Sequence, residues 1–402
     1  MTPFLRKILG MNWFFVFVMC ALLTFGVFMI ESAARHLPIS PAKLTEHGSA
    51  GAYFAWMQKN WIVVGSIAYF LAALIDYRWI RWLGAPLYAA SLGLMIMAMQ
   101  ADDDVHRLVI AGLSFQPAQL GVTSGIVMIA WLIQDLPKLH PLLGNPFVRI
   151  GIIGVVSAMP FLLVMKMGDM GSALVWIPVV IVALLIAGIP FRFLGFIAFV
   201  SAGILPILYF VILPLVSERG PDRIDLWLRM VQGEEVDIKG DGYAPHNVSM
   251  ALGKAGWSGL GWKASADRGS LHDKKFIPHL TAHNDFIVAV IGEELGFRGM
   301  LLMLGGFTLL LIQSLFIGFY SRDVAGRLIV CMVVALFFAH IFENIGMCVL
   351  LMPITGIPLP LVSYSGTFVV ICMFLLGLVQ SVWVHRLRGR EEAARLSDWL
   401  AD

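Results

Sequence analysis

The sequence predicts an all-α integral membrane protein with about ten transmembrane helices. Of its 402 residues, 59% are hydrophobic and only 13% are charged, and the mean hydropathy is +0.84. Soluble domains carry about 25% charged residues, so this composition excludes an ordinary soluble fold. The net charge of +2 is too small to indicate a nucleic-acid partner. All four cysteines lie inside apolar segments, which predicts small core residues rather than disulfides or metal ligands: Cys20, Cys331, Cys348 and Cys372.

Ten apolar segments approach the length of about twenty residues that a helix needs to cross a bilayer. We expect them to form one polytopic domain, residues 1–402, with a large loop, 216–285, between the seventh and eighth helices. A loop of this length is typical of a functional element. The predicted segments are 12–31, 61–77, 80–99, 119–134, 150–166, 172–189, 192–215, 286–318, 328–351 and 367–385.

The distribution of Lys and Arg predicts the orientation in the membrane. If the N-terminus is cytoplasmic, thirteen of these residues fall in cytoplasmic segments. The short outer loops then hold five: Arg35, Lys43, Lys59, Arg107 and Lys166. We therefore expect both termini in the cytoplasm, a cytoplasmic tail at 386–402, and the loop 216–285 outside.

Asp285 is the most informative residue. It precedes the apolar run 286–320 and follows a polar stretch that includes His283 and Asn284. A carboxylate at the mouth of a membrane helix is costly, which favours a functional role. The alternative is a carboxylate that only stabilises the positive end of the helix dipole.

Several motifs resemble the SEDS family (shape, elongation, division and sporulation), which includes the RodA and FtsW proteins. The resemblance covers essentially the whole chain, and the very short N-terminal segment is more similar to RodA. The longest matching blocks are Gly256–Trp262, His283–Gly296, Glu343–Met347 and Met352–Gly366.

The resemblance implies a peptidoglycan glycosyltransferase of the bacterial cytoplasmic (inner) membrane. Its substrate would be lipid II, a disaccharide-pentapeptide on a polyprenyl diphosphate, joined into glycan strands outside the membrane during cell-wall elongation. Asp285 falls on the catalytic aspartate of the family and would act as general base on the acceptor hydroxyl. The implied partners are a class B penicillin-binding protein, which is a transpeptidase, and other membrane proteins of the elongation complex.

The diphosphate leaving group needs positive charge from arginine, lysine or a divalent cation such as Mg²⁺ or Mn²⁺. Arg223 matches an arginine of the family's loop and is the favoured candidate. Lys263 and Arg107 are further substrate-binding candidates, as is Arg219, but for each of them the sequence favours a solvated cation or one that faces the lipid head groups. The sequence shows no classical spacing of metal ligands.

Other polar residues in the motifs are candidates for the site or its support. Asp169 could line a polar cavity or simply pair with Lys166. Ser363 and Tyr364 follow a segment that Pro353, Pro358 and Pro360 keep from forming a regular helix, so their hydroxyls could face substrate, as could His283. We expect the remaining acidic and basic positions to give structural support, with Glu294 and Arg298 paired at i, i+4: Glu293, Glu294, Arg298 and Glu343.

The chain departs from the family pattern at a buried ion pair. Gln119 and Val122 stand where the family has glutamate and lysine, so both charges are lost together, which strands neither. Two other functions stay open. A flippase for lipid II would also place polar residues inside a helix bundle. A non-catalytic scaffold for a penicillin-binding protein gains weight from the lost pair.

Overall fold

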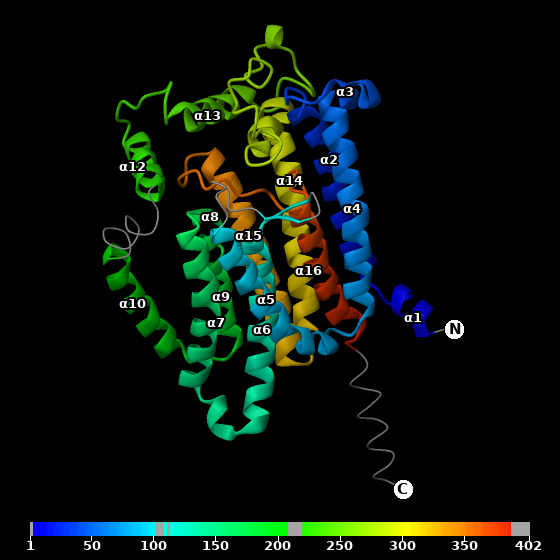
Figure 1. Ribbon diagram of the computed structural model, residues 1–402, viewed down its shortest axis with the longest axis vertical. Coiled ribbons are helices and arrows are strands. Elements are labelled where there is room, and N and C mark those ends of the chain that lie inside the picture. The colour runs from blue at the N-terminus through cyan, green and yellow to red at the C-terminus, as the bar shows by residue number, and fades with distance from the viewer. Residues whose placement is uncertain (1–2, 101–107, 111–112, 208–218, 387–402) are drawn as a thin grey trace.

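The computed structural model describes residues 3–100, 108–110, 113–207 and 219–386. In that part of the chain, long helices stand side by side as a bundle (Figure 1). Loops and the short helices α3 (Pro41–His47), α12 (Arg219–Val231) and α13 (Tyr243–Ala255) cover one end. The short helix α1 (Pro3–Leu9) and the last turn of α16 lie toward the other end.

The ten predicted segments correspond to ten helical segments of the bundle, which confirms the predicted fold class. Seven of the described segments are long and apolar enough to cross a membrane by length and composition. The α8/α9 and α10 segments are shorter, and α4 has the length but is not one of the seven. The bounds are α2 Trp13–Ala33, α4 Ala50–Leu74, α5 Arg81–Met99 after a 3₁₀ turn at Tyr77–Ile80, α6 Pro117–Leu139, α7 Pro146–Lys166, α8 Met170–Leu174 with α9 Trp176–Ile186, α10 Phe191–Ile207, α14 Ile287–Phe319, α15 Val324–Cys348 and α16 Thr367–Val384.

Two short elements lie outside the predicted helices. An antiparallel hairpin of β1 (Leu108–Ile110) and β2 (Leu113–Phe115) precedes α6, with Leu108 opposite Phe115. The helix α4 also begins eleven residues before its predicted segment, because Ser49 caps it by accepting a hydrogen bond from the Ala52 amide. The hairpin is too small to change the fold class.

Small residues set the contact between α4 and α16. A Cβ at Gly377 would meet the Tyr69 carbonyl oxygen at 2.5 Å, and one at Gly65 would collide with the sulfur of Met373. Glycine at both positions therefore lets the two backbones approach closely, as is common between membrane helices.

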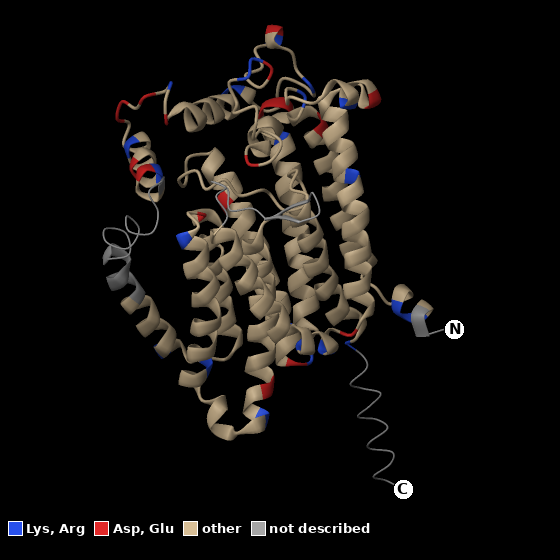
Figure 2. Ribbon diagram, in the orientation of Figure 1, with Lys and Arg blue, Asp and Glu red and all other residues tan. Residues whose placement is uncertain are grey.

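Charged residues gather at the two ends of the bundle, with few between them (Figure 2). The middle is filled by apolar side chains, and Phe307, Phe337 and Trp176 are among the largest that are fully buried. This distribution suits a bundle whose middle lies in hydrocarbon, where unpaired charges are costly.

The helix α14 is kinked at Gly296, where φ is 68° and ψ is −164°. The glycine-rich loop docks on this kink, because the amides of Leu260 and Gly261 donate to the carbonyls of Glu293 and Glu294, at 2.9 and 2.8 Å. A Cβ at Gly296 would collide with the Gly259 backbone. The glycines of this motif thus allow two backbones to lie in direct contact.

The kink also explains one wrong prediction. Glu294 and Arg298 do not pair, because Gly296 between them breaks the helical spacing that an i, i+4 pair requires. Glu294 instead accepts a hydrogen bond from the Ser32 hydroxyl of α2 at 2.5 Å, and the Arg298 side chain is exposed.

Candidate active site around Asp285

Asp285 lies in a tight turn immediately before α14, at the end of the bundle that the loops cover. The amides of Asp285 and Phe286 both donate to the Thr281 carbonyl, at 2.9 and 3.3 Å. The Asp285 side chain is half-buried. Its backbone is therefore fixed from the side of the preceding loop.

Asn344 of α15 fixes the same backbone from the membrane side. Its amide nitrogen donates to the carbonyl oxygens of both Asp285 and Ile357, at 2.9 and 2.7 Å. Gly356 has a φ of 75°, and a Cβ there would lie 3.6 Å from Oδ2 of Asp285. The segment 355–357 thus forms a wall beside the carboxylate. In the sequence, Asn344 is one residue of the motif Glu343–Met347, and nothing there points to this role.

Ser363 fixes the residue before Asp285. Its buried hydroxyl donates to the Asn284 carbonyl at 2.6 Å and accepts from the Leu359 amide at 2.9 Å. Because the hydroxyl makes both of these hydrogen bonds within the protein, the geometry favours a role for Ser363 in positioning the backbone before Asp285. The substrate contact predicted for Ser363 stays a prediction.

His283 and Tyr364 form an aromatic cluster with Phe54 of α4. The ring centroids of His283 and Tyr364 lie 5.1 Å from that of Phe54, and 5.3 Å from each other. Burial lowers the pKa of His283 to about 4 and raises the pKa of Tyr364 to about 12. Both side chains are therefore neutral at neutral pH, and they give the site shape rather than charge.

The lowered pKa of His283 predicts a pH-dependent stability. Its folded pKa of about 4 lies below the ordinary value of 6.5, so the unfolded chain binds the proton first. The stability that neutral His283 contributes is complete above pH 6.5 and is lost as pH falls toward 4. The melting temperature of the purified protein should decline over this interval, and less steeply in His283→Phe. Equal slopes for the two proteins would contradict this assignment.

Asp169 is held at the first turn of α8. Its Oδ1 accepts from the Ser172 amide at 3.0 Å, and its Oδ2 accepts from the Gln116 side chain at 2.7 Å. Within the described residues no ion pair joins Asp169 to Lys166, so the simple pairing is not formed.

The helix α8 packs against the wall beside Asp285, since a Cβ at Gly171 would lie 2.9 Å from Cβ of Thr355. Glu343 on α15 is 4% exposed, as expected for a membrane-buried acid. The structure thus brings Asp285 and the first turn of α8, which Asp169 caps, to one segment, 355–357.

The lost ion pair of α6 is replaced by a neutral contact. Gln119 is 2% exposed and donates to the Ser172 hydroxyl at 3.4 Å, while Val122 is fully buried among apolar side chains. Ser172 lies three residues after Asp169, and nothing in the sequence links it to Gln119.

Restoring the acidic residue alone should destabilise the protein. Gln119→Glu would bury a charge without its partner. Leaving one charge of a buried ion pair unpaired lowers the free energy of unfolding by about 3–5 kcal/mol. The double variant Gln119→Glu/Val122→Lys should recover part of that loss, because the two charges lie one helical turn apart. Thermal unfolding of wild type, of Gln119→Glu and Val122→Lys alone, and of the double variant measures the coupling, and additive single and double effects would contradict it.

The predicted cations differ in whether their side chains already have a partner in the protein. Arg223 of α12 is half-buried, and its guanidinium donates to the Ile354 carbonyl at 3.4 Å, two residues from Gly356. Lys263 is already paired with Glu31 at 2.7 Å and lies over the Trp262 ring. Arg107 and the Arg219 side chain lie outside the described residues. Among the predicted cations whose side chains are described, Arg223 is therefore the one that contacts the segment leading to the wall of the site.

A preformed metal centre is not found in the described part of the chain, where no three His, Cys, Asp or Glu side chains are grouped to hold an ion. The acidic stretch 102–106 lies outside it.

Comparison with known proteins identifies the family. The family model described as "Cell cycle protein", for FtsW, RodA and SpoVE, matches residues 12–388. The chain belongs to the FtsW/RodA/SpoVE family. One relative in this family is the peptidoglycan glycosyltransferase MrdB of Escherichia coli K12, which is 32% identical over 68% of this chain and 69% of its own length. Another is the probable peptidoglycan glycosyltransferase FtsW of Trichlorobacter lovleyi, 28% identical over 90% of each chain.

Solved structures related to the FtsW/RodA/SpoVE family share the fold. A chain from a peptidoglycan synthase complex, solved to describe the coordination of polymerization and crosslinking, aligns with a TM-score of 0.72 at 22% identity, over 94% of this chain and 98% of that one. The rod shape determining protein RodA of Thermus thermophilus aligns with a TM-score of 0.63 at 22% identity, over 94% and 97%. The chain is a multi-pass membrane protein of this fold.

Proposed function

We propose that this chain is a peptidoglycan glycosyltransferase that polymerises the disaccharide units of lipid II during cell-wall elongation. Its curated relatives carry the name of that activity. The observation that carries the proposal is Asp285, a half-buried carboxylate in the turn immediately before α14. Its backbone is held by Asn344 and by the Thr281 turn.

Asp285 is proposed to remove the proton from the acceptor hydroxyl of one saccharide unit. That oxygen bonds to the anomeric carbon of the donor while the bond from this carbon to the diphosphate oxygen breaks. The polyprenyl diphosphate leaves with the electron pair, and the α-linked donor gives a β-linked product by inversion. A base within reach of the hydroxyl contributes about 10²–10⁴-fold to such a step.

Arg223 is the proposed source of positive charge for the diphosphate, because it contacts Ile354 in the segment that leads to Gly356. A divalent cation such as Mg²⁺ or Mn²⁺ would add positive charge at the diphosphate, and titration of the reaction with EDTA measures that requirement.

We further propose that both termini are cytoplasmic and that the Asp285 site faces outward. Thirteen Lys and Arg against five support this orientation. A class B penicillin-binding protein is the proposed partner, supported by the similarity to a chain of a complex that couples polymerization and crosslinking. Co-purification of the two membrane proteins would test this partnership.

Reconstitution with labelled lipid II tests the function against its alternatives. Purified protein in vesicles should convert lipid II into long glycan strands without any other polymerase. Movement of lipid II across the vesicle membrane with no polymer would instead indicate a flippase. Neither polymer nor translocation, with intact binding of a penicillin-binding protein, would indicate a scaffold.

A further inference from the structure

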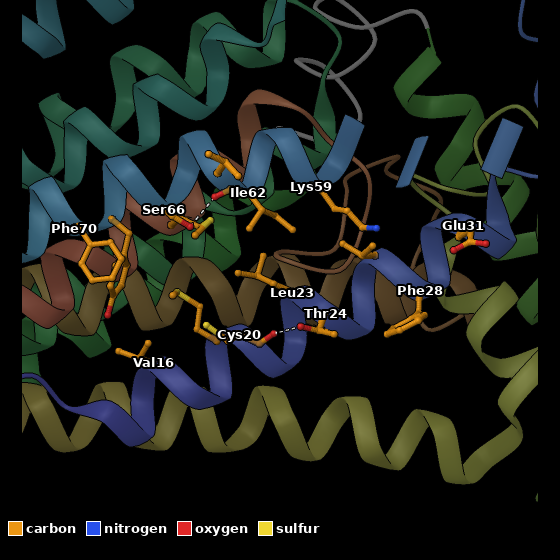
Figure 3. A pocket seen from close by; sticks show the side chains of 15 residues that line it. Val16, Cys20, Leu23, Thr24, Phe28, Glu31, Lys59, Ile62, Ser66 and Phe70 are labelled. Atoms are coloured by element: carbon orange, nitrogen blue, oxygen red, sulfur yellow. Dashed lines mark hydrogen bonds between the residues drawn. The ribbon is translucent and has the colours of Figure 1, made fainter. Parts of the chain in front are cut away.

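A groove of about 480 Å³ runs between α2 and α4 (Figure 3). On α2 it extends from Val16 to Glu31, and on α4 from Lys59 to Phe70. Fifteen residues of helix span ~22 Å, which is most of the ~30 Å hydrocarbon thickness of one bilayer. The groove is thus long enough to hold an extended hydrocarbon chain.

The walls of the groove offer almost nothing to a polar ligand. The Thr24 hydroxyl donates to the Cys20 carbonyl at 2.8 Å, and the Ser66 hydroxyl donates to the Ile62 carbonyl at 2.7 Å (Figure 3). Both hydroxyls are therefore used by their own helices. Tyr69 adds a buried hydroxyl without a hydrogen-bond partner in the described part of the chain, and the other side chains between the two ends are apolar. This lining fits an apolar chain.

The charged residues of the groove lie at one end. Glu31 and Lys59 sit there, whereas Val16 and Phe70 lie toward the other end (Figure 3). Glu31 is neutralised by Lys263 at 2.7 Å. Lys59 is exposed and has no ion pair among the described residues. The uncompensated charge at this end is therefore positive, which complements an anionic head group.

We propose that this groove holds the polyprenyl tail of one lipid-linked substrate, with the ammonium of Lys59 contacting its diphosphate. The inference rests on the proposed function, in which donor and acceptor are both lipid-linked and must be held at once. α4 joins the groove to the site, since the ring centroids of Phe54 and His283 lie 5.1 Å apart. Phe54 precedes Lys59 by five residues, or ~7.5 Å along the helix.

A second groove lacks the feature that selects a head group. It lies between α7, α9 and α10 with a volume of about 740 Å³, and none of the described residues that line it is charged. Its apolar lining would accept any lipid. Lys59 therefore distinguishes the groove between α2 and α4 as the one that binds an anionic lipid.

Cys20 provides a direct probe, because it is exposed and lines the groove. Purified full-length protein in nanodiscs would be treated with an apolar maleimide, and modification of Cys20 measured by peptide mass spectrometry. Lipid II and polyprenyl diphosphate should each slow the modification several-fold. Phosphatidylglycerol, which has one negative charge where a diphosphate has at least two, should slow it much less. Half-buried Cys331, outside the groove, should react at an unchanged rate. Equal protection by phosphatidylglycerol, or no protection by any lipid, would overturn the inference.

Kinetics of variants give a second test. Lys59→Ala should raise KM for lipid II about threefold to tenfold with kcat unchanged, as expected for a partly exposed charge contact. Val63→Trp, which fills the groove, should also raise KM. Lys254→Ala and Val64→Trp are the matched controls, because neither residue lines the groove. The exposed fraction of Val64, 49%, is similar to the 61% of Val63.

The outcomes separate the inference from the proposed function. If wild-type protein polymerises lipid II and all four variants share its KM, the groove assignment is wrong while the function stands. If wild-type protein does not polymerise lipid II, the proposed function fails, and the protection of Cys20 still decides whether the groove binds the polyprenyl lipid.

Discussion

Replacement of Asp285 by asparagine should lower the rate of lipid II polymerisation by about 10²–10⁴-fold, the range expected for loss of a positioned general base. The amide is isosteric with the carboxylate, so the hydrogen bonds from Asn344 and to Thr281, which involve only the Asp285 backbone, should persist. We therefore expect kcat to fall while the affinity for lipid II changes little. Initial rates with labelled lipid II and a binding assay on the same preparation measure both quantities.

Asp267→Asn is the matched control, because Asp267 is an exposed carboxylate of the same loop and touches none of the residues around the site. It should polymerise at the wild-type rate. A wild-type rate in Asp285→Asn would remove Asp285 from the chemistry.

Replacement of Glu293 by leucine should produce a large loss of stability. Glu293 is 2% exposed and accepts hydrogen bonds from the Leu271 and His272 amides, the latter at 3.1 Å, and from the Ser270 hydroxyl at 3.1 Å. Leucine would leave two buried amides without an acceptor, at about 1–3 kcal/mol each. Thermal unfolding should shift down by about 5–15 °C.

Glu293→Gln provides the control for this effect. It retains one acceptor oxygen, so its unfolding temperature should lie between those of wild type and Glu293→Leu. The loop also contacts α2, because the His272 ring lies 3.1 Å from the Ala33 carbonyl. We therefore expect faster proteolysis of the loop 256–275 in Glu293→Leu. Identical unfolding temperatures for all three proteins would contradict the role assigned to Glu293.

The helical segments were predictable because each is a long apolar run. The ends of these helices were harder to predict. α4 begins at Ala50 because the Ser49 cap, rather than hydropathy, sets its first residue. The hairpin at residues 108–115 escaped prediction because three-residue strands leave almost no periodic signal. Hydropathy reports burial in lipid, and these features depend on local hydrogen bonds instead.

The candidate site was only partly predictable for a related reason. The position of Asp285 at the mouth of a helix is a local feature, visible in the sequence. Its support by Asn344 depends on contacts across 59 residues, which one sequence does not reveal. The expected pair of Glu294 and Arg298 assumed an unbroken helix, and Gly296 adopts a backbone conformation set by the docked loop. The resemblance to the family favours Arg223 as the cation for the diphosphate. In the structure its guanidinium donates to the Ile354 carbonyl.

The dependence of kcat/KM on pH tests the central claim, that Asp285 acts as general base, most directly. A carboxylate base works only after losing its proton, so the wild-type value for lipid II polymerisation should fall as acid protonates Asp285. The residual activity of Asp285→Asn should be flat over the same acid range. A wild-type profile without an acid limb, or an acid limb that persists in Asp285→Asn, would contradict the account.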